Sequence, residues 1–159
     1  MSAVIKESDI FIRPMSNDDI SSIINIENHA YDFPWSQTIF HDCLHAGYSS
    51  WIIEYDEIVT GYGIMQISSD ESHILNLCVH PDYQSIGLGK QLLKHFLNLA
   101  EAHNINRIFL EARPTNFKAI KLYYNMGFNE IGRRRNYYPT KIGREDAVVL
   151  AKTLLIEDS

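Results

Sequence analysis

One stretch of the chain, Val79 to Gln91, combines residue types that suit a ligand carrying phosphate. It reads V-H-P-D-Y-Q-S-I-G-L-G-K-Q, with an apolar run before it and an amphipathic pattern after it. Gly87 and Gly89 have no Cβ atom, so a ligand can approach the backbone closely and the turn can adopt a positive φ. The N–H groups of Ser85 to Lys90 would be unpaired donors at the positive end of a helix dipole. The stretch therefore predicts a phosphate-binding turn between a strand and a helix.

Two nucleotide-binding motifs do not fit the spacing of this turn. A G-x-x-x-x-G-K-[ST] loop needs a hydroxyl residue after its lysine, but Lys90 is followed by Gln91. A G-x-G-x-x-G motif needs a third glycine where Leu92 stands. The pattern that remains is Gln84-x-x-Gly87-x-Gly89. The alternative to a phosphate-binding turn is a plain glycine-rich connection between a strand and a helix.

The cysteines and two of the histidines offer other kinds of chemistry. Cys78 could act as a nucleophile, but a cysteine inside an apolar strand is usually inert packing. Cys43 and Cys78 both stand in apolar patterns and indicate no disulfide framework. His41 and His45 would share one face of a helix, as pairs of zinc ligands do. No H-E-x-x-H pattern or third ligand accompanies them, so we expect no metal site.

The composition indicates one folded domain. A chain of 159 residues with 45% apolar residues is large enough for a sizeable core. Residues 1–9 lack the basic start and apolar run of a signal peptide, and no apolar stretch approaches the ~20 residues that cross a bilayer. We expect a cytoplasmic protein with no membrane partner and no direct binding to nucleic acid.

The net charge of −6 is unevenly distributed along the chain. Residues 1–83 contain 13 acidic and 2 basic residues, whereas residues 84–159 contain 7 acidic and 12 basic residues. An uneven surface charge without consequence is one explanation. Because the basic half also holds the glycine turn, we favour an anionic ligand for the second half and a cationic one for the first.

Hydrophobic spacing in the first half predicts two short helices followed by antiparallel strands. Between the helices, the aromatic segment Tyr31 to Ser36 either lines a binding surface or fastens the helices to the core through Phe33 and Trp35. Gly61 and Gly63 indicate a bulge or a close backbone approach. The predicted elements are a strand at 10–13 stopped by Pro14, a helix capped by Ser16 or Asn17 and reaching about His29, a helix capped by Ser36 and reaching about His45, and strands at 49–55 and 58–67 joined by a tight turn at Asp56-Glu57.

The second half alternates strands and helices. This order predicts an α/β (α+β) fold: one domain over residues 1–159, with its core at about 10–153 and a mixed, mostly antiparallel central sheet flanked by helices. The predicted elements are a strand at 72–79, a helix from about Gly87 to His103, a strand at 107–111, a helix opened by Asn116 and closed by Gly127, and strands at 128–138 and 146–153 joined by a polar loop from Pro139 to Glu145.

The chain resembles the GCN5-related N-acetyltransferase (GNAT) superfamily, whose Q/R-x-x-G-x-G/A turn matches Gln84 to Gly89. Within that superfamily it resembles the RimI type, the bacterial ribosomal-protein alanine N-acetyltransferases, over residues 10–153. A small departure is Pro114, where that family usually has a small residue. The matching stretches are Phe33 to Ser36, Leu110 to Arg113 with Asn116, Ala119 to Tyr123, Gly127-Phe128, Arg135 to Thr140 and Gly143 to Ala147, the last two being the most specific.

The resemblance implies the acyl-CoA N-acyltransferase fold and acetyl-CoA as cosubstrate. Glu111 matches the family's general base, and we expect burial at the end of an apolar strand to raise its pKa. Tyr123 matches the proton donor to the coenzyme A thiolate. From the residues alone, Glu111 could instead be a structural carboxylate paired with Arg113 or Arg107. Tyr123 could instead be a core tyrosine. The predicted cofactor-binding residues are Leu77, Cys78, Val79, Ser85, Ile86, Gly87, Leu88, Gly89, Lys90, Asn116 and Tyr123, and the predicted substrate-binding residues are Phe33, Trp35, Tyr137 and Tyr138.

The resemblance further implies direct acetyl transfer, without a covalent acyl-enzyme, to the N-terminal alanine of protein eighteen of the small ribosomal subunit. Two alternatives remain: the same chemistry on protein lysines or a small amine, and a non-catalytic sensor that binds acetyl-CoA. Glu111 and Tyr123 argue against the sensor, because a sensor needs only the glycine turn.

Overall fold

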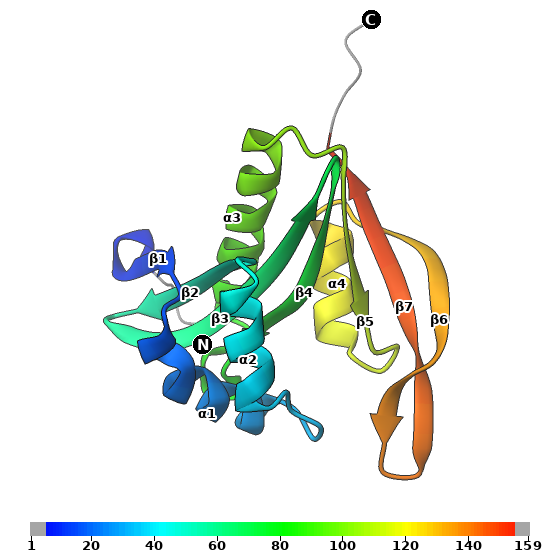
Figure 1. The fold of residues 1–159 in the computed structure, drawn as a ribbon, viewed down its shortest axis with the longest axis horizontal. Helices are drawn as coiled ribbons and strands as arrows, with labels where there is room; N and C mark the ends of the chain where they lie inside the picture. The colour runs from blue at the N-terminus through cyan, green and yellow to red at the C-terminus, as the bar shows by residue number, and fades with distance from the viewer. Residues whose placement is uncertain (1–5, 155–159) are drawn as a thin grey trace, which may run out of the picture. The chain divides into compact units, whose positions relative to one another are not determined.

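The structure, a computed structural model, describes residues 6–154, which contain four α-helices and seven strands. The strands follow the order β1-β2-β3-β4-β5-β7-β6 in one sheet (Figure 1). The described residues divide into two compact units, one of residues 6–66 and 76–96 and the other of residues 67–75 and 97–154. None of the helices in the described range is long and apolar enough to cross a bilayer. The assignment of the chain to a single domain stays a prediction.

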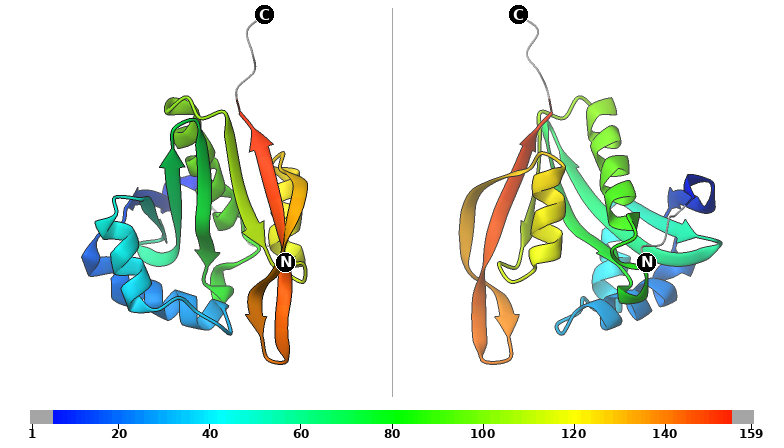
Figure 2. Two further views of the ribbon diagram at one scale, coloured as in Figure 1. Left: turned by 45° about the vertical axis from the view of Figure 1, so that its right-hand side comes forward. Right: turned by 180° about the vertical axis from the view of Figure 1, so that it is seen from behind.

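The first unit contains two short helices. The helix α1 (Ile20–Ala30) continues from a 3-10 turn at Asn17–Asp19, which has a capping box in which the Ser16 N–H donates to Asp19 Oδ2 at 2.9 Å. The Ser36 hydroxyl accepts a backbone N–H bond at 3.4 Å at the start of α2 (Gln37–His45). The helices lie side by side in all three views (Figures 1 and 2). Both predicted helices are confirmed.

The antiparallel strands of the first half are β1 (Ile10–Pro14), β2 (Ser49–Tyr55) and β3 (Ile58–Ser68). Asp56 and Glu57 join β2 to β3 with φ of 52° and 67°, which gives the predicted tight turn. A Cβ atom on Gly61 would lie 2.6 Å from the carbonyl oxygen of Cys78, so the predicted close approach is confirmed. Pro14, predicted to stop the first strand, is its last residue.

Strand β4 (Glu71–Val79) leads through the glycine turn into α3 (Leu88–Ala102), as predicted. Leu88, Leu92 and Phe96 are buried and spaced four apart, so they form one apolar stripe along the helix. A side chain at Gly63 would overlap the Phe96 ring, which explains the glycine in β3.

The second unit contains β5 (Arg107–Ala112), α4 (Phe117–Asn125), β6 (Asn129–Thr140) and β7 (Gly143–Thr153). Strand β5 pairs in parallel with Glu71–Ile74 of β4 and antiparallel with β7, which also pairs antiparallel with β6. The predicted mixed sheet is confirmed. Gly127 has φ of +94° after α4, the left-handed conformation predicted for it.

The predicted polar loop from Pro139 to Glu145 is wrong. Strands β6 and β7 extend through most of it as a long twisted hairpin, with Tyr138 opposite Glu145 and Thr140 opposite Gly143 (Figure 1). Pro139 is tolerated because β6 is the last strand in the sheet order, where a missing N–H disrupts no further ladder.

Candidate active site

The glycine turn is exposed at the start of a fifteen-residue helix. Gly87 has φ of +99° and Ser85 has φ of 66°, so the backbone folds through the left-handed region twice. The side-chain amide of Gln84 donates to the carbonyl oxygen of Val79 at 2.8 Å and fixes the start of the turn. The Gln91 N–H bonds to the Gly87 oxygen at 3.1 Å, which leaves the preceding N–H groups outside the helical ladder. This backbone can bind phosphate oxygens.

The strand before the turn contains Cys78, whose thiol is poorly suited to act as a nucleophile. Cys78 is 4% exposed, and burial, reinforced by the charge of Glu27, raises the pKa of its thiol to about 12. A thiol with this pKa stays protonated at neutral pH and is a poor nucleophile. Leu77 and Val79 flank it on β4, which brings the three predicted residues together.

A buried carboxylate, Glu27, fixes the aromatic segment after α1. Its Oε1 accepts hydrogen bonds from the Tyr62 hydroxyl and, at 3.1 Å, from the Asn76 amide. Its Oε2 accepts the Trp35 N–H at 2.7 Å. The Trp35 indole packs 5.4 Å from an aromatic ring of α2, whereas the Phe33 side chain is 40% exposed. Trp35 therefore fastens the segment, and Phe33 presents its ring to solvent.

In the second unit, Glu111 on β5 is held at both carboxylate oxygens. His73 on β4 is bonded through Nε2 to Oε2, and Arg134 on β6 donates from Nε to Oε1 at 2.9 Å. The His73 ring stacks on Phe109, with centroids 4.4 Å apart and planes 16° from parallel. Only 6% of the Glu111 side chain is exposed. The carboxylate is thus buried, charge-paired and fixed in orientation.

The pKa of Glu111 departs from its ordinary value in the direction opposite to our expectation. Burial raises the pKa, but the hydrogen bonds and charges of His73 and Arg134 together hold it below its usual range. The expectation of a raised pKa is wrong because neither partner was identified from the sequence. The pairings with Arg113 or Arg107 are also wrong, since those arginines bind other carboxylates. Glu111 is ionised at neutral pH and can accept a proton.

Helix α4 carries two more predicted residues. Asn116 caps the helix, its side-chain oxygen accepting the N–H of Ala119 at 3.3 Å. Tyr123 is 7% exposed, with its ring 5.9 Å from that of Phe128. Burial raises the pKa of Tyr138, and the charges of Glu111 and Tyr123 add to the rise. Tyr138 therefore lies within electrostatic range of both Glu111 and Tyr123.

Tyr137 and Tyr138 lie where the ladder between β6 and β7 is irregular. The Arg134 guanidinium lies 5.7 Å from the Tyr137 ring centroid, and the Arg113 guanidinium lies 4.5 Å from that of Tyr138. Burial, followed by the charge of Glu111, raises the pKa of both phenols. Both hydroxyls stay protonated at neutral pH and can donate hydrogen bonds.

Residues of the family-like stretches at 110–113, 135–140 and 143–147 hold the β6–β7 hairpin in shape. Arg113 donates to the carbonyl oxygen of Pro139 at 2.9 Å and to Glu145 Oε1 at 2.8 Å. The Asp146 carboxylate accepts the N–H of Asn136 at 3.0 Å, at the irregular part of β6. These residues position the two tyrosines.

Sequence reasoning missed His73 and Arg134. The parallel register pairs His73 with Phe109, which places Glu111 two positions further on the same face of the neighbouring strand. The arginine run at 133–135 was a visible signal. Only the alternation of side chains along β6 decides that the middle arginine faces the carboxylate.

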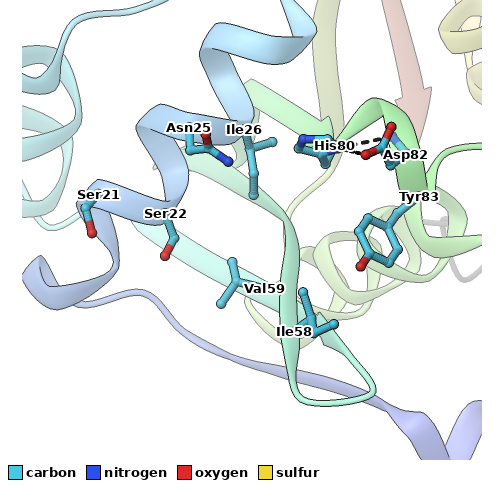
Figure 3. A pocket seen from close by; sticks show the side chains of 9 residues that line it. All are labelled: Ser21, Ser22, Asn25, Ile26, Ile58, Val59, His80, Asp82 and Tyr83. Atoms are coloured by element: carbon cyan, nitrogen blue, oxygen red, sulfur yellow. Dashed lines mark hydrogen bonds and ion pairs between the residues drawn. The ribbon is translucent and has the colours of Figure 1, made fainter.

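Two open depressions in the first unit are lined by residues outside the predicted site. The first, about 520 Å³, lies between α1, β3 and the turn after β4, and the Asp82 N–H donates to His80 Nδ1 at its edge (Figure 3). The second, about 590 Å³, is lined by His41 and His45 with Asp42. Within residues 6–154, no three His, Cys, Asp or Glu side chains are grouped so as to hold a metal ion. The absence of a metal site stays a prediction. Figure 3 labels the lining residues of the first depression: Ser21, Ser22, Asn25, Ile26, Ile58, Val59, His80, Asp82 and Tyr83.

Comparisons with known proteins agree with this geometry. Residues 18–128 match the acetyltransferase (GNAT) family. The chain is 38% identical over 140 residues to the [ribosomal protein bS18]-alanine N-acetyltransferase of Escherichia coli K12, covering 88% of this chain and 95% of that protein. The crystal structure of the E. coli ribosomal-protein-S18-alanine N-acetyltransferase superposes with a TM-score of 0.87 at 36% identity, over 94% of this chain and 96% of that chain.

A more distant structure shares the fold. Salmonella typhimurium yncA, solved with its cofactor acetyl-CoA, has a TM-score of 0.75 at 22% identity, over 95% of this chain and 97% of that chain. The family match spans more than half of the sequence, and the E. coli relative is similar over nearly its whole length. The chain therefore belongs to the acetyltransferase (GNAT) family and is an N-acetyltransferase.

Proposed function

We propose that this enzyme uses acetyl-CoA to acetylate the N-terminal alanine of the small-subunit ribosomal protein bS18. The observation that carries the proposal is the 38% identity over 140 residues to the E. coli enzyme named for that activity. The ionised, fixed carboxylate of Glu111 supplies the base that the reaction needs. In the proposal the enzyme acts in the cytoplasm, and residues 1–159 form one domain with its core at about residues 10–153.

The glycine turn fits the pyrophosphate of acetyl-CoA, which brings the acetyl group as a thioester. Gly87 leaves room for phosphate oxygens at the backbone, and the start of α3 favours negative charge. In the proposal, the backbone of Leu77 to Val79 binds the pantetheine arm and polarises the thioester carbonyl. Asn116 and Tyr123 provide the remaining cofactor contacts.

The proposal assigns one residue to each proton transfer: one takes a proton from the attacking amine, and the other gives a proton to the leaving sulfur. An α-amino group has an ordinary pKa of about 8, so most of it is protonated at pH 7 and must lose a proton before it attacks. Glu111 accepts this proton, and the free amine attacks the thioester carbonyl. Tyr123 donates its hydroxyl proton to the sulfur as the carbon–sulfur bond breaks, and the proton that the acetylated nitrogen then loses restores the hydroxyl. The raised pKa of Cys78 supports direct transfer rather than an acyl-enzyme.

The proposed contacts with the peptide come from two aromatic segments. Phe33 and Trp35 provide the first, and Tyr137 and Tyr138 the second. The excess of acidic residues in the first half favours a basic N-terminal segment. The acetylation rate should therefore fall as added salt screens the attraction.

A transfer assay tests the proposal. The purified protein is incubated with acetyl-CoA and a peptide carrying the bS18 N-terminus, and acetylated peptide and free coenzyme A are measured by mass spectrometry and thiol detection. A peptide with a blocked N-terminus and an internal lysine is the control. We expect acetylation of the alanine α-amine only. Equal rates on the blocked peptide would favour the lysine alternative, and acetyl-CoA binding without any transfer would favour the sensor.

A further inference from the structure

We propose that His73 and Arg134 are positioning residues for the reaction, which aim the Glu111 carboxylate at the substrate amine by holding one of its oxygens each. This inference rests on the proposed function. It adds two residues that lie outside the assigned catalytic pair of Glu111 and Tyr123.

The contacts define the two roles. Arg134 Nε donates to Oε1 at 2.9 Å and His73 Nε2 is bonded to Oε2, so the plane of the carboxylate is set from both sides. His73 is itself fixed by stacking on Phe109. Each carboxylate oxygen has two lone-pair directions, so one partner per oxygen orients the group and leaves room for the amine proton.

The same contacts determine how basic the carboxylate is. Burial alone would raise the pKa of Glu111, and the two partners reverse that effect. Removing either partner while Glu111 stays buried must therefore raise the pKa of this carboxyl. Two further titratable groups on which the charge of Glu111 acts are Tyr137 and Tyr138 of β6. Both phenols are protonated at neutral pH, so they do not contribute a competing titration there.

The test compares His73→Ala with His73→Gln in the acetylation assay. Alanine removes the bond to Oε2, whereas glutamine can supply a side-chain N–H in place of Nε2. We expect His73→Ala to lower kcat by about tenfold or more at pH 7, since a small misplacement of a catalytic group has that effect. The acid limb of its kcat/KM profile should move to higher pH, and His73→Gln should restore most of kcat.

Matched controls separate positioning from folding. Arg134→Ala should behave like His73→Ala, whereas Arg133→Ala, next in sequence and paired with exposed Glu130, should leave the rate unchanged. His103→Ala is the control for loss of an imidazole, because the His103 ring lies just after α3 and is bonded through Nδ1 to the carbonyl oxygen of Leu99 at 2.8 Å. The KM for acetyl-CoA should stay constant across all five variants, and the loss of stability in His73→Ala and Arg134→Ala should be small enough to leave both folded at the assay temperature.

A second measurement does not depend on activity. The carboxyl carbon of Glu111 can be titrated by NMR in the wild-type protein and in His73→Gln and His73→Ala, and its pKa should be highest in the alanine variant. Unchanged pH profiles and an unchanged Glu111 titration in His73→Ala would overturn this inference alone. If the wild-type protein acetylates no amine, the proposed function fails, while the titration still decides whether the two partners control the carboxyl.

Discussion

Two carboxylates, one in each unit, are buried but held by different kinds of partner. Glu27 is 1% exposed and accepts hydrogen bonds from three uncharged donors: the Tyr62 hydroxyl, the Asn76 amide and the Trp35 N–H. The Glu111 side chain is 6% exposed and is bonded to a histidine and an arginine, whose side chains are 20% and 49% exposed.

The difference is the one that we expect between a structural carboxylate and the proposed catalytic base. Among the partners of Glu27, Tyr62 is fully buried and the other two are half-buried, so removing the carboxylate would leave a buried hydroxyl and two half-buried N–H groups without their acceptor. The partners of Glu111 reach solvent and can bond to water instead. Burial alone therefore does not mark a catalytic acid or base, whereas the charge and exposure of its partners do.

The largest expected effect is a difference in stability between variants of the two carboxylates. Glu27→Ala should lower the free energy of unfolding by about 3 kcal/mol or more, because three donors lose their acceptor. Glu111→Ala should lower it by less than about 1 kcal/mol, since its partners can turn to water. Urea denaturation with a constant m-value measures both. Equal losses would show that the two carboxylates have the same structural role.

Two buried tyrosines extend the comparison to catalysis. Tyr123→Phe should lower kcat by about 10²-fold, as expected for loss of a general acid, with little change in acetyl-CoA affinity. Tyr62→Phe removes a hydroxyl bonded to Glu27 and should reduce stability while sparing kcat in the folded fraction. Steady-state kinetics on both variants measures whether kcat falls in Tyr123→Phe and is retained in Tyr62→Phe. A Tyr123→Phe enzyme with wild-type kcat would remove Tyr123 from the mechanism.

The cofactor turn should respond more weakly than the catalytic groups. Gly87→Val should weaken acetyl-CoA binding by about tenfold, or about 1.4 kcal/mol, because φ of +99° strains any branched residue and its side chain meets the phosphates. Gly132→Val is the matched control, since a Cβ there enters open space. Calorimetry on both variants, after their folding is verified, measures the effect. Undiminished binding by Gly87→Val would contradict the turn assignment.

The smallest expected effect concerns stability in acid. Because the pKa of Glu111 is lower in the folded protein than its ordinary 4.5, its ionised form stabilises the fold above that pH. This contribution is lost as the pH falls below about 4.5 and through the folded-state pKa. The melting temperature of Glu111→Gln should therefore fall less steeply than that of the wild type over this acidic range. Parallel curves would mean that the charge partners contribute no net stability.

The sequence predicted the elements well where local signals were strong. Ser36, Asn116 and the pair Asp56-Glu57 act locally through caps and turns, so the helix starts and the tight turn were foreseeable. The hairpin near Pro139 was not, because its pairing depends on β7 rather than on local turn residues.

The candidate site shows the same division between local and long-range information. The glycine turn was predicted from its own residues, whereas the direction of the pKa shift of Glu111 was predicted wrongly. Its partners, His73 and Arg134, stand 38 and 23 positions away in the chain and are brought together by the strand register. A pKa set by such contacts cannot be obtained from periodicity and spacing.

The central claim is that Glu111 is the base for acetyl transfer, and one measurement tests it most directly. The kcat/KM of Glu111→Gln is compared with that of the wild type on an alanine-starting peptide at pH 7 and pH 9. We predict a loss of about 10²-fold or more at pH 7 and a smaller loss at pH 9, where an amine of pKa about 8 deprotonates unaided. Wild-type kcat/KM at both pH values, in a variant that folds normally, would contradict the account.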